Sequence, residues 1–159
     1  MGFIRCLLYA AAIGIGSFLL GRLLPAGWFL PEKFPYRSMA WEKGGRIYDS
    51  IFHIRKWQAK VPDMSKLLPG LMQPKKVTKD FRQELPRMIQ ETCIAELIHS
   101  LLCLAALPCL RIWPGWGGII FTVLYMLGNI PFIMIQRYNR PRLLGLLERM
   151  SPKDSGKEL

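Results

Sequence analysis

The sequence has few acidic residues, few histidines, and three long stretches with almost no charge. Asp and Glu number 11 among 159 residues, against 22 Lys and Arg, and there are 2 histidines. Residues 6–21 and 117–136 carry no charged side chain, and residues 93–110 carry only Glu96 and His99. A basic domain that binds nucleic acid in water would not collect its apolar residues in such blocks. The pattern therefore excludes nucleic acid as the partner and favours membrane lipids with anionic headgroups.

Signals of metal chemistry are also missing. The 4 cysteines lie in or beside the apolar blocks and are not spaced as metal ligands. A Glu and a His three residues apart, like Glu96 and His99, also occur in di-iron helix bundles. Those bundles need a second copy and further carboxylates, which this sequence lacks. We therefore expect no metal and no covalently bound cofactor.

The apolar blocks predict an all-α integral membrane protein with about three spanning helices. A spanning helix needs roughly 20 mainly apolar residues. The first block reaches this length, over about residues 4–24, if Arg5 and Arg22 extend toward the headgroups. The other blocks predict spans of about 93–112 and 117–136. A cleaved signal peptide is the alternative for the first block, although Arg22 follows the apolar core and no clean cleavage site is present.

Basic residues set the expected orientation of a single membrane domain over residues 1–159. Segment 25–92 contains 13 Lys and Arg, the tail 137–159 contains 6, and the link between the second and third blocks contains 1. Because basic segments remain in the cytoplasm, both should be cytoplasmic and the N-terminus should lie outside. The last two spans then form a hairpin that turns at Pro114-Gly115.

The cytoplasmic segment is expected to contact the membrane surface. Residues 45–61 mix apolar and aromatic side chains with four basic ones, in a pattern typical of an amphipathic helix. We expect this interfacial helix to end at Pro62-Asp63.

Polar residues should meet inside the predicted hairpin. His99 and Asn129 are each fifteen residues from Pro114, so they should lie at one depth. Glu96 and His99 share a helix face, and we expect them to hydrogen-bond. At helical rise His99 lies roughly 9 Å from the cytoplasmic surface. Intramembrane ionisable groups are costly and often functional, but a purely structural pair is the alternative.

Arginines cluster just below this depth. The string "QRYNRPR", residues 136–142, contains three arginines, whose planar guanidinium groups suit phosphates. Together with Gln136 and Asn139, we expect Arg137, Arg140 and Arg142 to bind the substrate. Simple anchoring of the helix end by these basic residues is the alternative.

The constellation fits acyl transfer from acyl-CoA to a hydroxyl of a membrane-linked acceptor. His99 would act as general base, Glu96 would hold its tautomer, and Asn129 would donate to the developing oxyanion. The sequence has no "GxSxG" nucleophile motif, so we favour direct transfer over a covalent acyl-enzyme.

Four strings carry a resemblance to a known family. These are "EKGGRIYD" (42–49), "IRKWQAKVPD" (54–63), "AELIH" (95–99) and "NIPFIMIQRYNRPRL" (129–143). Together they resemble the glycosyl-4,4'-diaponeurosporenoate acyltransferase family of small bacterial membrane enzymes. The resemblance implies a bacterial cell-membrane location, an acyl donor such as acyl-CoA, and a glycosylated lipid such as a carotenoid glycoside as acceptor.

Two other function classes stay open from the residues alone. One is another lipid-modifying enzyme, a methyltransferase or reductase, whose nucleotide cofactor would bind the arginines. The other is a non-catalytic membrane adaptor. Because three helices enclose little space, a homo-oligomer that completes the pocket is also an arrangement to test.

Overall fold

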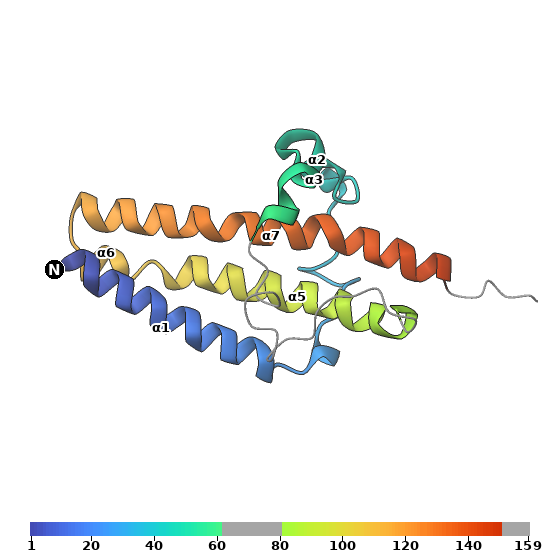
Figure 1. The fold of residues 1–159 in the computed structure, drawn as a ribbon, viewed down its shortest axis with the longest axis horizontal. Helices are drawn as coiled ribbons and strands as arrows, with labels where there is room; N and C mark the ends of the chain where they lie inside the picture. The colour runs from blue at the N-terminus through green and yellow to red at the C-terminus, as the bar shows by residue number, and fades with distance from the viewer. Residues whose placement is uncertain (62–80, 151–159) are drawn as a thin grey trace, which may run out of the picture.

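The computed structural model describes residues 1–61 and 81–150 and contains three helices long and apolar enough to cross a membrane. Helix α1 (Gly2–Leu23), helix α5 (Phe81–Ala105) and helix α7 (Trp116–Met150) run side by side along the long axis (Figure 1). The described residues contain helices and turns and no strand. The predicted all-α class and the three apolar helices are therefore confirmed.

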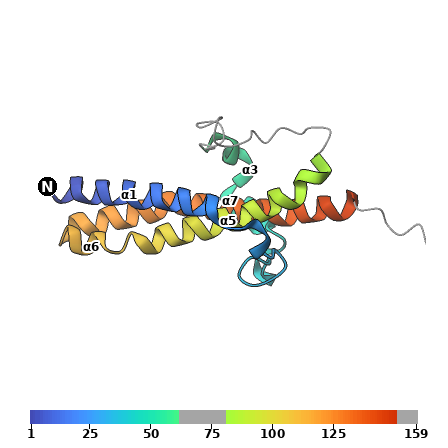
Figure 2. The same cartoon turned by 90° about the horizontal axis from the view of Figure 1, so that it is seen from below.

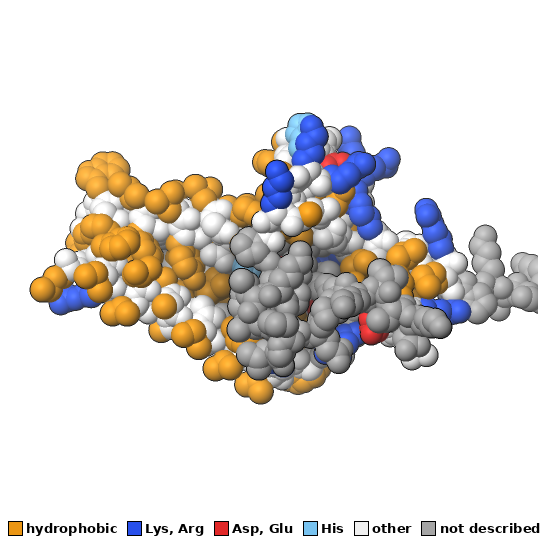
Figure 3. All heavy atoms as spheres, viewed as in Figure 1, with side chains coloured by type: hydrophobic (Ala, Val, Ile, Leu, Met, Phe, Trp, Pro, Cys, Tyr) orange, Lys and Arg blue, Asp and Glu red, His pale blue; other side chains and the backbone are white. Residues whose placement is uncertain are grey.

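The bundle has one apolar half and one charged half. Most exposed apolar side chains lie on α1 and on the neighbouring parts of α5 and α7, where water would make their exposure costly (Figure 3). Basic side chains gather instead on the segment around residues 46–57, which stands out from the bundle beside α7, and on the C-terminal end of α7 (Figure 3). This division is the one expected when the apolar half lies in lipid.

The α5–α7 hairpin has the predicted turn but longer helices than expected. Helix α5 ends at Ala105, the short α6 (Cys109–Ile112) follows Pro108, and Gly115 turns the chain with a φ of 89°. Helix α5 begins at Phe81 instead of residue 93, and α7 continues to Met150 instead of ending near 136. Both helices thus extend past the apolar blocks, with Pro86 and Pro141 inside them.

Helix α1 packs beside this hairpin and is long and apolar enough to cross a membrane. Cys6 at its start is fully buried, and its Sγ contacts the carbonyl oxygen of Cys109 at 3.7 Å. At its other end, Gly21 lies against Ile98 of α5. Trp113 packs over Gly2 and Gly117, where a Cβ atom would collide with its ring.

The predicted continuous interfacial helix over residues 45–61 is broken. Helix α2 (Arg46–Phe52) is followed by α3 (Ile54–Trp57) and the 3-10 turn η3 (Gln58–Lys60), with His53 in the left-handed region between them. Tyr48 and Ile54 form a small core with Tyr138 of α7, and this core determines where the chain bends. We call residues 39–60, which include the 3-10 turn η2 (Ala40–Glu42), the head.

The head lies directly on α7. Gly45 has a φ of 80°, and a Cβ there would come within 3.1 Å of the carbonyl oxygens of Arg137 and Tyr138. Glycine is required because the turn is left-handed and the two backbones nearly touch. The segment before the head, which includes the 3-10 turn η1 (Ala26–Trp28), links it to α1 and lies on the other side of the bundle from α3 (Figure 2). The end predicted for the interfacial helix, Pro62-Asp63, lies outside the described residues.

Candidate active site

His99 and Asn129 face each other across the hairpin, as their equal distances from Pro114 predicted. His99 Nδ1 lies 2.8 Å from Asn129 Oδ1. The imidazole also stacks on Phe132 of α7, with ring centroids 4.5 Å apart and planes inclined by 9°. We call these three residues the neutral layer.

The hydrogen bonds of Asn129 fix the tautomer of His99. Asn129 Nδ2 donates to the carbonyl oxygen of Tyr125 at 2.9 Å, so its Oδ1 is the atom that faces the imidazole. An amide oxygen can only accept, and His99 must therefore donate from Nδ1. In a neutral imidazole this leaves the lone pair on Nε2, which is the atom that can take a proton from a substrate.

The prediction that Glu96 hydrogen-bonds with His99 is wrong, although the two residues are one helical turn apart. Glu96 Oε1 accepts a hydrogen bond from Arg137 Nη1 and its Oε2 accepts one from Arg140 Nη2. Glu96 is 7% exposed, so this carboxylate is held between two guanidinium groups in a buried position. Charge-assisted bonds to arginine are stronger than a bond to a neutral imidazole, which explains why Glu96 pairs there. The predicted orienting role therefore belongs geometrically to Asn129.

The arginines reach Glu96 from further along α7. Glu96 and Phe132 are equally far from Pro114, whereas Arg137 lies more than one turn beyond. Helical side chains lean toward the N-terminus of their helix, so the long arginines of α7 extend back up the hairpin. Pairing residues by their distance from the turn ignores this tilt of the side chains, so it does not predict that Arg137 and Arg140 reach Glu96.

Glu42 completes the ionic site, although it was not among the predicted site residues. Its two oxygens accept hydrogen bonds from Arg137 Nε and Nη2, and Oε1 also accepts one from the hydroxyl of Tyr48. Burial alone would raise the pKa of Glu42, but the hydrogen bonds from Arg137, Tyr48 and the Met39 backbone outweigh it and lower that pKa. Glu42 and Arg137 are 95 positions apart, so no local pattern could link them.

Arg140 anchors the other side of the same site. It is 2% exposed, and its guanidinium donates to Thr92 Oγ1 at 2.8 Å, to Thr92 O and to Tyr36 O. It also lies over the Tyr36 ring, 5.4 Å from the centroid. We call Glu42, Glu96, Arg137 and Arg140 the ionic layer.

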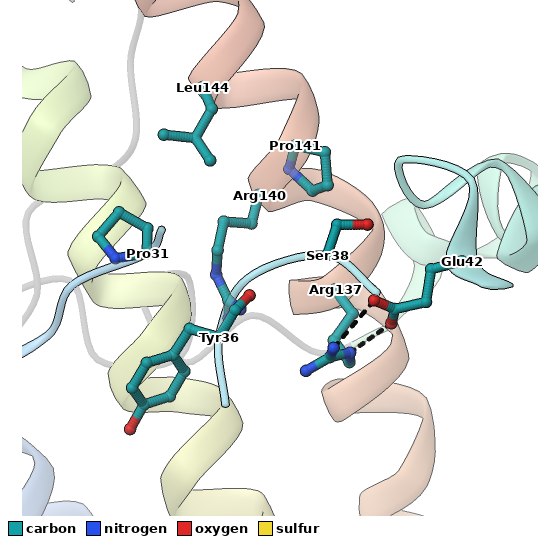
Figure 4. Close-up of a pocket in the computed structure, with 8 residues that line it drawn as sticks. All are labelled: Pro31, Tyr36, Ser38, Glu42, Arg137, Arg140, Pro141 and Leu144. Atoms are coloured by element: carbon teal, nitrogen blue, oxygen red, sulfur yellow. Dashed lines mark hydrogen bonds and ion pairs between the residues drawn. The ribbon is translucent and has the colours of Figure 1, made fainter. Parts of the chain in front are cut away.

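A strap of chain, residues 31–38, runs across the ionic layer. Arg137 donates to the carbonyl oxygens of Pro35 and Arg37, while Arg140 binds that of Tyr36. The strap and α7 enclose a small hollow, in which Ser38 and Leu144 lie near the two arginines (Figure 4). Glu42 approaches Arg137 from the head, as the dashed lines in Figure 4 mark.

The ionic layer leaves little capacity for the expected phosphate. The Arg137 guanidinium makes five hydrogen bonds, to Glu42, Glu96, Pro35 and Arg37. A guanidinium has five N–H groups, so a phosphate would have to displace one of these partners. In this structure Arg137 and Arg140 therefore join α7 to α5, the strap and the head.

Among the described residues, the remaining predicted site residues form no side-chain hydrogen bond with either layer. Arg142 is exposed; it donates to the Tyr138 carbonyl oxygen at 2.6 Å and covers the Tyr138 ring. Gln136 and Asn139 are half-buried on α7. Among the residues that the structure describes, no side-chain hydrogen bond is formed by either amide.

Fold and site together define a multi-pass membrane protein with a polar site inside a helical hairpin. Comparison with known families narrows this class. The glycosyl-4,4'-diaponeurosporenoate acyltransferase family matches residues 26–149, and the chain belongs to this family of acyltransferases.

Individual relatives agree with this assignment. The glycosyl-4,4'-diaponeurosporenoate acyltransferase of Staphylococcus aureus strain MRSA252 is 31% identical over 144 residues, which cover 89% of this chain and 86% of the relative. The protein of the same name from strain Newman is 30% identical over 150 residues, covering 93% and 89%. No solved structure matches the chain. Both members of the neutral hydrogen bond and all of the ionic layer fall within the matched region.

Proposed function

We propose that this acyltransferase moves a fatty acyl group from acyl-CoA, or a similar donor, to a hydroxyl of a glycosylated lipid such as a carotenoid glycoside. His99 is the general base. The observation that carries this role is the chain of hydrogen bonds from His99 Nδ1 through Asn129 to the Tyr125 carbonyl oxygen. It leaves the Nε2 lone pair available and holds the ring in one orientation.

The reaction balances with the residues of this site. His99 Nε2 takes the proton of the acceptor hydroxyl while the hydroxyl oxygen attacks the thioester carbonyl carbon. The tetrahedral intermediate then collapses, the carbon–sulfur bond breaks, and the imidazolium returns its proton to the departing thiolate. The products are the ester and free CoA, and the enzyme is unchanged.

The other residues receive roles that follow their contacts. Asn129 orients His99, and only its second amide N–H remains to serve the oxyanion. For the substrates we propose Gln136 and Asn139, whose amides are not engaged by described residues, and Arg142 for a donor phosphate. Arg137 and Arg140 fix Glu96 and thereby hold α5 against α7, one turn from His99.

The excess of basic residues in segment 25–92 and in the tail supports a location in a bacterial cell membrane with these parts in the cytoplasm. The N-terminus then lies outside. Under this orientation the site opens in the cytoplasmic leaflet, where a cytoplasmic acyl donor and a membrane-held acceptor can meet.

The direct test is transfer of a labelled acyl group from acyl-CoA to a glycosylated carotenoid by the purified protein in detergent micelles. His99→Ala should lower kcat roughly 100- to 10,000-fold, the usual contribution of a general base. The matched control is His53→Ala, because His53 is the second histidine and lies exposed in the head. A His99→Ala protein with full turnover would exclude the proposed base.

A further inference from the structure

Glu42 is the one member of the ionic layer that comes from outside the hairpin. Glu96 lies on α5 and both arginines lie on α7, whereas Glu42 ends the 3-10 turn η2 in the head. It is 1% exposed and binds Arg137 through both carboxylate oxygens. Without Glu42 the buried layer would contain two cations and one anion.

Stability alone does not explain why the protein removes the charged side chains of the ionic layer from water. Removing charges from water is expensive, and apolar residues of similar size often stabilise a fold as well as a buried ion pair does. Here Glu42, Glu96 and Arg140 are buried around the Arg137 side chain, which is 11% exposed, and every buried polar side-chain atom in the described part of the chain has a partner. Such a complete network fixes geometry and charge together, which apolar packing would not do.

The position of the ionic layer near His99 indicates a second role for its charge balance. Glu96 lies one helical turn from His99, and the base becomes a cation when it takes the proton of the acceptor. A nearby excess of positive charge would oppose that change, because like charges repel strongly where water is excluded. Balanced layers of two acids and two arginines remove this excess.

We propose that Glu42 is a positioning residue for acyl transfer: it holds Arg137 so that the ionic layer is electrically balanced one turn from His99. This inference rests on the proposed function of His99. Glu42 touches no substrate in this account and acts through Arg137, Glu96 and Arg140.

Several charged and titratable groups lie on the elements that surround the base. On its own helix these are Cys93, Glu96 and Cys103, on α7 they are Tyr125, Arg137 and Arg140, and the strap and the head contribute Tyr36 and Glu42. Helix α1 packs against α5 through Gly21 and Ile98 and carries Arg22 beside that contact. Within this set the variant Glu42→Gln alters the net charge of the ionic layer by one unit and leaves the other groups in place.

The test compares kcat, KM and the pH profile of acyl transfer for the full-length protein and three variants. Glu42→Gln should lower kcat roughly tenfold with little change in KM, since only the charge balance in the transition state is altered. The pH at which activity falls to half on the acid side should also move down. Glu42→Asp keeps the charge and should restore most of the activity and the original pH profile.

Glu32→Gln is the matched control, because Glu32 lies in the neighbouring strap and is exposed. It should leave kcat and the pH profile unchanged. If Glu42→Gln does not fold, Tyr48→Phe removes one hydrogen bond to Glu42 and should lower kcat by a smaller factor. If the pH profile of Glu42→Gln is unchanged, the inference is overturned. If Glu42→Gln does not fold, an unchanged kcat for Tyr48→Phe would overturn it.

The two proposals fail in different ways. If the wild-type protein transfers no acyl group, or His99→Ala remains active, the proposed function is wrong. If His99→Ala is inactive while Glu42→Gln matches the wild type in kcat and pH profile, only the role of Glu42 is wrong.

Discussion

The neutral layer and the ionic layer lie one helical turn apart and have opposite chemical character. His99, Asn129 and Phe132 combine one neutral hydrogen bond with ring stacking, and this leaves one imidazole nitrogen available. Glu42, Glu96, Arg137 and Arg140 use charge, and nearly every donor and acceptor is occupied. A group that must exchange protons needs a free atom, whereas a group that joins segments needs full occupancy. This contrast supports the proposed chemistry of the first layer and a role of the second in joining α5, α7 and the head.

The largest expected effect is on folding and comes from breaking the ionic layer. Glu96→Ala should destabilise the protein by about 3–5 kcal/mol, because two buried arginines lose their shared partner. Glu91→Ala is the matched control on the same helix, since Glu91 is 42% exposed and pairs with Arg87 at the surface. Thermal unfolding in detergent would measure both. Equal melting temperatures for the two variants would show that the ionic layer does not hold the fold.

The next effect concerns the neutral layer and should appear in turnover. Asn129→Leu should lower kcat roughly 10- to 100-fold, because His99 loses the acceptor that fixes its tautomer. Thr122→Val is the control: Thr122 lies buried on α7 and its hydroxyl bonds to the Ala106 carbonyl oxygen at 3.5 Å. If both variants lose activity equally, the loss comes from helix packing and the two-layer comparison is wrong.

The smallest effect is a pH dependence of stability. The pKa of Glu42 is lowered in the folded protein from its ordinary value of 4.5, so Glu42 stabilises the fold above that value. The contribution is lost as pH falls through the lowered pKa, when the carboxylate is protonated. Melting temperature should therefore fall below about pH 4.5 more steeply for the wild type than for Glu42→Gln. Parallel curves for the two proteins would contradict this linkage.

Individual residues show how far sequence reasoning reached in the site. The pairing of His99 with Asn129 followed from equal distances to a Pro-Gly turn, because helical rise is constant. The pairing of Glu96 with His99 followed from spacing on one helix and was wrong. Spacing shows which side chains can meet, but the stronger partners came from α7 and were closer in the folded protein.

Element boundaries show the same limit. The apolar blocks predicted three long helices, but α5 and α7 continue well beyond them, and the added parts bury Leu85 and Ile89 of α5 and Tyr138 and Arg140 of α7. Residues 45–61 were expected to form one helix, but the chain bends at His53, and Ile54 packs into a core shared with Tyr138. An amphipathic pattern indicates which residues are buried, but it does not indicate against which surface they pack.

By itself the sequence determined the helical membrane class, the hairpin turn and the resemblance to an acyltransferase family, because these depend on residue type, run length and local spacing. Tertiary structure alone decided the partners of Glu42, Glu96 and the arginines. Those contacts join segments up to 104 positions apart, and their strength depends on burial and charge at one point in space. Chain order carries no record of that proximity, so only the fold could separate His99, the residue proposed for chemistry, from the four residues that join α5, α7 and the head.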